Sequence, residues 1–149
     1  MADKTTQQHL DHIARAMKDI DFAMLGTHTK DGQIGARPMS NNGQVDYSGD
    51  SYYFTWEDSL MVTDIKGDPK VGLSFQGAPS PQGAPGAFIA IEGEAKIVRD
   101  KAAFEKHWTE GLERWFKDGT ETEGMVMLHI KATRAAYWDG ENEGDFDIA

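Results

Sequence analysis

The 149-residue sequence contains no cysteine, which excludes disulfide frameworks, thiolate nucleophiles, cysteine-ligated zinc and iron–sulfur clusters. Such cross-links are not required here, because one domain of this size buries roughly 70% of its unfolded surface. We expect a single domain over residues 1–149, with its core at about 6–140 and an acidic tail at 141–149. The lack of cysteine is also typical of a reducing compartment, so we expect a cytoplasmic protein.

Long apolar runs and clustered basic residues are missing too. Because no apolar run approaches the length of about 18 residues that a spanning helix needs, we expect no contact with a membrane interior. Residues 1–17 lack the apolar region of a secretory signal. The 15 Lys and Arg residues against 25 Asp and Glu residues give a formal charge of −10, which disfavours nucleic acid as a partner. An anionic ligand stays compatible where a few basic groups converge.

Metal-binding and hydrolytic motifs do not occur in the sequence. The five histidines form no HxxxH or HExxH pair, so we expect no metal site. No GxSxG motif is present to carry a nucleophilic serine. The carboxylates of Glu141 and Glu143 fall in the expected tail rather than in a site shielded from water. We therefore expect no hydrolase chemistry.

The hydrophobic pattern predicts a mainly β chain that starts with a helix. Thr5 and Gln8 form a capping box, and the helix that follows ends near residues 19–21. Further helices are expected at residues 58–66 and from Asp100 onward. Strands are expected at residues 22–27, 34–37, 51–55, 70–75, 87–99 and 125–138.

Turn and breaker residues refine this outline. Gly32 suits a hairpin turn, Pro38 is expected to halt the return strand, and residues 41–43 predict a second turn. Gly93 is expected at a bulge, and residues 77–86 form a Pro/Gly loop. The helix from Asp100 is expected to carry four apolar side chains at helical spacing: Phe104, Trp108, Leu112 and Trp115.

About six strands without a regular βαβ alternation favour an antiparallel barrel, closed or partly closed, with peripheral helices. A parallel nucleotide-binding sheet is disfavoured, because no Gly-rich phosphate turn follows a strand. We therefore assign the chain to the mainly β (α+β) class.

One constellation suits anion binding. Arg37, Pro38 and Met39 follow a hairpin strand, and residues 54–59 run from a strand into a helix start. Unpaired N–H groups at a helix N-terminus attract anions, Ser59 adds a hydroxyl donor, and Arg37 can complete a phosphate clamp. Any surface arginine beside a helix cap would fit the same pattern.

The combination of motifs resembles the pyridoxamine 5′-phosphate oxidase-like family, and within it the general stress protein branch. The resemblance rests on Arg37-Pro38-Met39, residues 52–59 (YYFTWEDS) and residues 64–75 (DIKGDPKVGLSF). Residues 115–119 (WFKDG) and 136–139 (AYWD) support it at the far end. It covers roughly residues 6–140, with the segments in the expected order.

The resemblance implies a split β-barrel that forms a homodimer with two flavin sites in grooves between the subunits. The positions that hold the flavin phosphate in the family match Arg37 and Ser59. Met39, Phe54 and Thr55 would flank the isoalloxazine ring or its ribityl chain. Trp138 would lie near the site of the partner subunit.

The four tryptophans and one departure from the family pattern complete the expected site. Trp56 lies at the strand-to-helix turn, where contact with a ligand is expected, whereas Trp108 and Trp115 are more typical of core.

Where the family often has a lysine two residues after the serine, this chain has Met61. A lost charge-assisted contact is worth about 1.5–3 kcal/mol, or one to two orders of magnitude in FMN affinity.

Three functions stay open on the sequence. The leading hypothesis is a stress protein that binds FMN or FAD, with the flavin supplying any redox chemistry. The first alternative is a flavin-dependent oxidoreductase that acts on a small molecule or a pyridine nucleotide. The second is an interaction protein that kept the barrel and lost the cofactor, as Met61 and the acidic composition would suit.

Overall fold

The structure, a computed structural model, describes residues 4–41 and 46–148. It contains seven antiparallel strands in one sheet, with the order β2-β1-β4-β5-β6-β3 and with β7 paired to β6 off this path. The strands are β1 (Phe22–His28), β2 (Ile34–Ser40), β3 (Asp50–Trp56), β4 (Lys70–Gln76), β5 (Phe88–Val98), β6 (Met125–Asp139) and β7 (Asn142–Asp147). The helices are α1 (Thr6–Met17), α2 (Leu60–Gly67) and α3 (Lys101–His107), and 3-10 turns cover Glu110–Arg114 and Gly119–Glu121.

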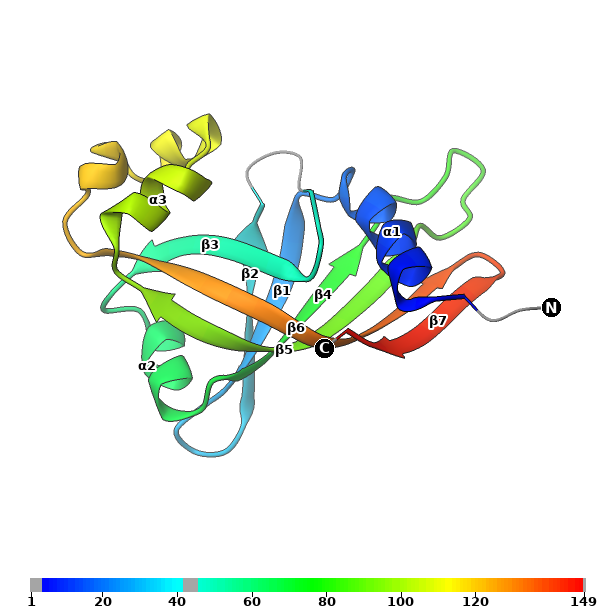
Figure 1. Ribbon diagram of the computed structural model, residues 1–149, viewed down its shortest axis with the longest axis horizontal. Coiled ribbons are helices and arrows are strands. Elements are labelled where there is room, and N and C mark those ends of the chain that lie inside the picture. Colours follow the sequence, from blue (N-terminus) through cyan, green and yellow to red (C-terminus); the bar gives the residue numbers. More distant parts are fainter. Residues whose placement is uncertain (1–3, 42–45, 149) are drawn as a thin grey trace.

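The long strand β6 organises the sheet. Its residues 127–138 pair with β5 on one side, while β3 and then β7 occupy successive stretches of its other side. Strands β2 and β3 end the path and do not pair with each other within the described residues, so the barrel stays open between them. Figure 1 shows the sheet strongly twisted, with α3 and the 3-10 turns near one end of β3 and α1 near β7.

Two hydrophobic cores fix the arrangement. The main core packs α1 and α2 against the sheet, with Ile13, Leu25 and Leu128 fully buried. The second core is smaller and joins β3 and β6 to the segment after β5 through Phe54, Phe104, Leu112, Phe116, Met125 and Met127. The second core therefore holds the chain after Trp108 beside β3.

Several local expectations are confirmed. The Thr5 hydroxyl accepts the Gln8 amide N–H and the Gln8 side chain accepts the Thr5 N–H, which completes the capping box. Gly32 adopts φ 79°, as a hairpin turn requires. The register of β5 against β6 shifts between Glu92 and Gly93, where an added Cβ would lie 2.6 Å from the Lys131 carbonyl oxygen.

Three expectations about secondary structure are wrong. Strand β2 runs through Pro38 to Ser40; proline is tolerated there because β2 is an edge strand. The helix from Asp100 stops at His107, because Thr109 and Gly111 follow and both are poor helix formers. The expected acidic tail contains β7, which raises the strand count from about six to seven.

The second predicted turn, at residues 41–43, lies mostly outside the described residues, since only Asn41 belongs to them. Within residues 4–41 and 46–148, no helix is long and apolar enough to cross a bilayer. The same residues bring together no group of three or more His, Asp or Glu side chains that would hold a metal ion.

Candidate functional site

A pocket of about 290 Å³ opens where β2 and β3 fail to pair. The strands contribute Phe22, Pro38, Met39, Ser40, Phe54, Thr55 and Trp56, and the segment after α3 contributes Leu112, Trp115 and Phe116. This volume is close to the lower end of the range for ligand pockets, and the lining is largely apolar and aromatic, as ligand pockets usually are. The pocket therefore suits a flat aromatic group.

Five of the nine residues predicted for the site line this pocket: Pro38, Met39, Phe54, Thr55 and Trp56. Strand β3 presents three of them because its residues 50–56 pair with residues 125–131 of β6 in an unbroken register. Phe54 is held from behind by edge contacts to Phe104 and Trp108, with ring centroids 5.7 and 5.3 Å apart. The pocket wall therefore rests on a packed core rather than on a loop.

Two exposed tryptophans line the pocket. Trp56 is 42% exposed, and its ring centroid lies 4.9 Å from that of Phe116. Trp115 is 55% exposed, and the Arg114 guanidinium lies 5.1 Å from its ring centroid. The sequence suggested that Trp115 belongs to the core, because its spacing from Trp108 fits one helix face. The helix breaks between them, so only Trp108 packs against the second core.

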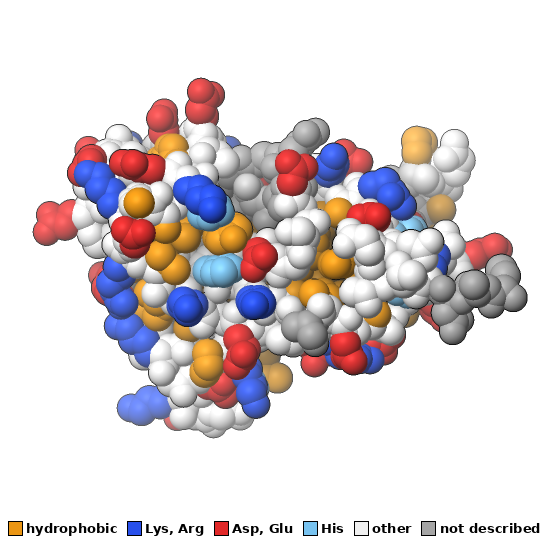
Figure 2. Space-filling view, viewed as in Figure 1, with side chains coloured by type: hydrophobic (Ala, Val, Ile, Leu, Met, Phe, Trp, Pro, Cys, Tyr) orange, Lys and Arg blue, Asp and Glu red, His pale blue; other side chains and the backbone are white. Residues whose placement is uncertain are grey.

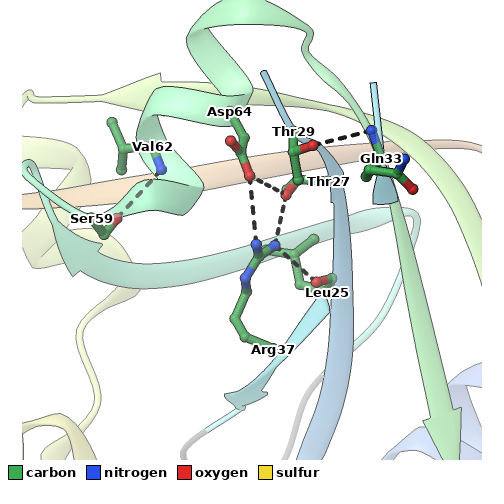
Figure 3. Close-up of polar contacts among 8 residues, drawn as sticks. All are labelled: Leu25, Thr27, Thr29, Gln33, Arg37, Ser59, Val62 and Asp64. Atoms are coloured by element: carbon green, nitrogen blue, oxygen red, sulfur yellow. Dashed lines mark hydrogen bonds and ion pairs between the residues drawn. The ribbon is translucent and has the colours of Figure 1, made fainter. Parts of the chain in front are cut away.

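Arg37 lies outside the pocket lining, on the opposite side of β2 from Pro38. Its Nη1 donates to the Leu25 carbonyl oxygen at 3.1 Å and to the Thr27 hydroxyl at 2.8 Å. Its Nη2 lies 3.6 Å from Oδ2 of Asp64 on α2, and the Thr27 hydroxyl donates to the same oxygen at 2.8 Å. Figure 3 shows the guanidinium turned toward Thr27 and Asp64.

Ser59 caps α2, as the sequence predicts. Its Oγ accepts the Val62 amide N–H at 3.3 Å, and Figure 3 shows this contact at the start of the helix. The hydroxyl hydrogen stays available to a ligand. The next residue, Leu60, is 80% exposed, so the helix start presents an apolar side chain to solvent.

The remaining predicted residues lie elsewhere. Met61 is buried in the main core, with 8% of its surface exposed. Trp138 is 48% exposed and pairs with Phe88 across β5 and β6, on the sheet face opposite to the buried Tyr137. The structure thus divides the predicted site into the pocket, the Arg37–Ser59 region and an exposed sheet face.

That sheet face carries exposed apolar side chains on β1, β2 and β5, together with charged side chains of β4 and β5 such as Lys70, Glu92 and Glu94. Met24 and Ile34 are 45% and 77% exposed, and they line a groove of about 760 Å³ that also contains Gly26, Ala36 and Gly72. Phe22 and Phe88 extend the face toward Trp138, and Phe22 also lines the pocket. Pocket and sheet face are therefore adjacent. Figure 2 shows acidic, basic and hydrophobic side chains interspersed over the face that is viewed as in Figure 1.

Histidines contact aromatic rings and carboxylates away from the pocket. His9 Nδ1 lies 2.9 Å from the Tyr137 hydroxyl oxygen, and its ring stacks on Phe146 of β7. Burial, together with the charges of Lys4 and His12, lowers the pKa of His9 below its usual 6.5. This contact joins α1 to the last two strands and has a structural role.

A family profile and one curated relative match most of the chain. Residues 8–148 match the profile of the family described as Pyridoxamine 5′-phosphate oxidase like. The curated relative Protein bli-3 of Neurospora crassa is 24% identical over 139 residues, which cover 87% of this chain and 64% of that protein. The chain thus spans less than two thirds of the length of that relative.

Solved structures share the fold at low sequence identity. A protein of Clostridium acetobutylicum related to general stress protein 26 has a TM-score of 0.78 at 20% identity, covering 97% of both chains. The general stress FMN/FAD binding protein of Xanthomonas citri has a TM-score of 0.71 at 23% identity, covering 91% of this chain and 92% of its own. A heme binding protein of Mycobacterium smegmatis has a TM-score of 0.74 at 13% identity, covering 99% of this chain and 60% of its own.

These likenesses confirm the predicted fold class, a mainly β chain with an antiparallel barrel that stays open on one side. The profile match covers nearly all of the described residues, in agreement with the resemblance seen in the sequence motifs. The chain belongs to the pyridoxamine 5′-phosphate oxidase-like family.

Proposed function

We propose that the chain binds a flavin nucleotide, FMN or FAD, non-covalently in the pocket between β2 and β3. The observation that carries the proposal is the meeting of Met39, Phe54, Thr55 and Trp56 in one pocket, since these residues were assigned to a flavin from the sequence. The flavin-binding relative from Xanthomonas citri, similar in fold, supports the choice of ligand.

The residues present fit the ring end of a flavin. The largely apolar lining and the exposed rings of Trp56 and Trp115 offer stacking surface to an isoalloxazine. The phosphate end would be directed toward Arg37 and the Ser59 hydroxyl. When bound, the flavin supplies electron and hydride transfer, while the protein holds the ring and limits its contact with water.

We also propose that the chain works as a homodimer through the exposed apolar side chains of this sheet face. Large apolar side chains that gather on one face of a monomer mark an interaction site, and a two-fold interface places the same patch of both copies together. Phe22 belongs to both the face and the pocket, so a second copy would cover the mouth of the pocket. Trp138 of the partner subunit would then lie near the flavin.

An absorbance spectrum of the purified protein tests the flavin proposal. We expect flavin bands in the fresh protein, or their appearance after incubation with FMN or FAD followed by gel filtration. Mass spectrometry of the molecule released on denaturation then distinguishes FMN from FAD. Protein that stays colourless and binds neither nucleotide at micromolar concentration contradicts the proposal.

The same preparation tests the two alternatives. Anaerobic reduction of the bound flavin by NADH or NADPH would favour an oxidoreductase, whereas a flavin that stays oxidised would favour a binding role. The cofactor-free interaction protein is favoured by one observation: Arg37 already faces a carboxylate of its own chain. It requires that no flavin binds.

A further inference from the structure

The phosphate end of the proposed site contains a carboxylate of the protein itself. Asp64 on α2 has only 10% of its side chain exposed, and its Oδ2 lies 3.6 Å from Nη2 of Arg37. The Thr27 hydroxyl accepts from Arg37 and donates to the same Asp64 oxygen, so the three side chains form a closed polar triad. A phosphate that contacts Nη2 must approach this carboxylate.

The donors of Arg37 are partly used before any ligand arrives. A guanidinium carries five N–H donors. Both donors of Nη1 are directed to protein oxygens, those of Leu25 and Thr27. Only the edge formed by Nε and Nη2 remains for a two-point grip, and Asp64 lies beside that edge.

Two basic side chains near α2 share one carboxylate of the chain, that of Glu57. Lys66 Nζ lies 3.5 Å from a carboxylate oxygen of Glu57, and Arg99 forms two hydrogen bonds to the same carboxylate at 2.7 and 3.0 Å. The bond from Arg99 also holds the pKa of Glu57 below its usual range, so Glu57 keeps its charge at neutral pH. Leu60 and Met61 offer no charge where the helix begins.

We infer that Asp64 makes the site nearly indifferent to a terminal phosphate, so that riboflavin binds about as tightly as FMN. The inference rests on the proposed flavin function and assigns Asp64 the role of setting ligand specificity. Affinity then comes from the ring, which contacts the apolar pocket. The attraction of Arg37 for the phosphate is offset by repulsion between the phosphate and the nearby carboxylate.

Dissociation constants of riboflavin and FMN for the wild-type protein test the inference directly. A guanidinium without a nearby carboxylate would form a charge-assisted contact with the phosphate, and FMN would then bind about 10- to 100-fold tighter than riboflavin. We expect FMN to bind less than about tenfold tighter than riboflavin, measured by quenching of flavin fluorescence at low ionic strength. A preference for FMN of about tenfold or more overturns the inference and leaves the proposed function intact.

A variant isolates the carboxylate. Asp64→Asn keeps an oxygen that accepts the Thr27 hydroxyl but removes the charge. We expect it to tighten FMN binding about tenfold and to leave riboflavin binding within about twofold. Asp31→Asn is the matched control, because it removes one charge from an exposed turn without contacting Arg37, and it should change neither constant.

Two further outcomes are decisive. Equal effects of Asp64→Asn on FMN and riboflavin, in a variant with wild-type circular dichroism, overturn the specificity role. Should neither flavin bind the wild-type protein, the proposed function fails and the inference falls with it. The wild-type comparison needs no variant, so the test stands even if Asp64→Asn does not fold.

Discussion

Replacing Ile34 by alanine should weaken the proposed dimer strongly and leave the monomer folded. Ile34 is 77% exposed on the sheet face, so its side chain contributes little to the core of its own chain. Full burial of an isoleucine side chain is worth about 1.5–3 kcal/mol, and the exposed share corresponds to about 1–2 kcal/mol per copy. Because a two-fold interface contains the residue twice, the dimer should lose about 2–4 kcal/mol, or ~30- to 1,000-fold in its dissociation constant.

Sedimentation equilibrium over a dilution series measures this change. Leu60→Ala is a suitable control, because Leu60 is 80% exposed but belongs to α2 rather than to the sheet face. We expect the control to dimerise like the wild type. Wild-type affinity in Ile34→Ala would remove Ile34 from the interface, and a wild-type protein that stays monomeric at high concentration would refute the reasoning about the sheet face.

Three further predictions concern the pocket, the sheet and the histidines. Trp115→Ala should weaken flavin binding about tenfold in a calorimetric titration, because an apolar contact of about 50 Å² carries roughly 1.3 kcal/mol; unchanged affinity would exclude Trp115 from the site. Gly93→Ala should destabilise the fold by about 1–3 kcal/mol in urea unfolding, because its Cβ would lie 2.6 Å from the Lys131 carbonyl oxygen. His9 should titrate below pH 6.5 in NMR spectra, since burial lowers its pKa. The unfolded state then binds protons more readily, so the contribution of His9 to stability should be present above about pH 6.5 and decline as the pH falls through the folded pKa; a titration above 6.5 would contradict this.

Local signals in the sequence predicted most of the fold. The capping box at Thr5 and the turn at Gly32 depend only on neighbouring residues, so the local sequence is enough to predict both. The alternation of residues 70–75 matches the observed strand β4, in which Val71 and Leu73 are buried. These features require no knowledge of the rest of the chain.

The errors arise where tertiary contacts override local preference. Strand β7 has a strongly acidic sequence and buries only Phe146, so its pattern is typical of a solvated tail. The ladder to β6 and the ion pairs of Arg134 with Asp145 and Asp147 hold it in the sheet. The helix break after His107 has a local cause. The apolar spacing predicts a longer helix, but Thr109 and Gly111 are poor helix formers and the helix ends before them.

The candidate site could be predicted in part for the same reason. Met39, Phe54 and Thr55 belong to regular strands, and all three line the pocket, while their contact with a flavin stays a prediction. The contact between Arg37 and Asp64 joins β2 to α2, and a pair so far apart in the sequence leaves no local signal. Trp115 was assigned to the core because the sequence predicted one continuous helix.

A crystal structure of the protein grown with FMN tests the central claim most directly. We predict electron density for the isoalloxazine ring between β2 and β3, against Trp56 and Trp115, in a pocket covered by a second copy of the chain. Density for the flavin at any other place, or a pocket that stays empty at saturating FMN, would contradict the account.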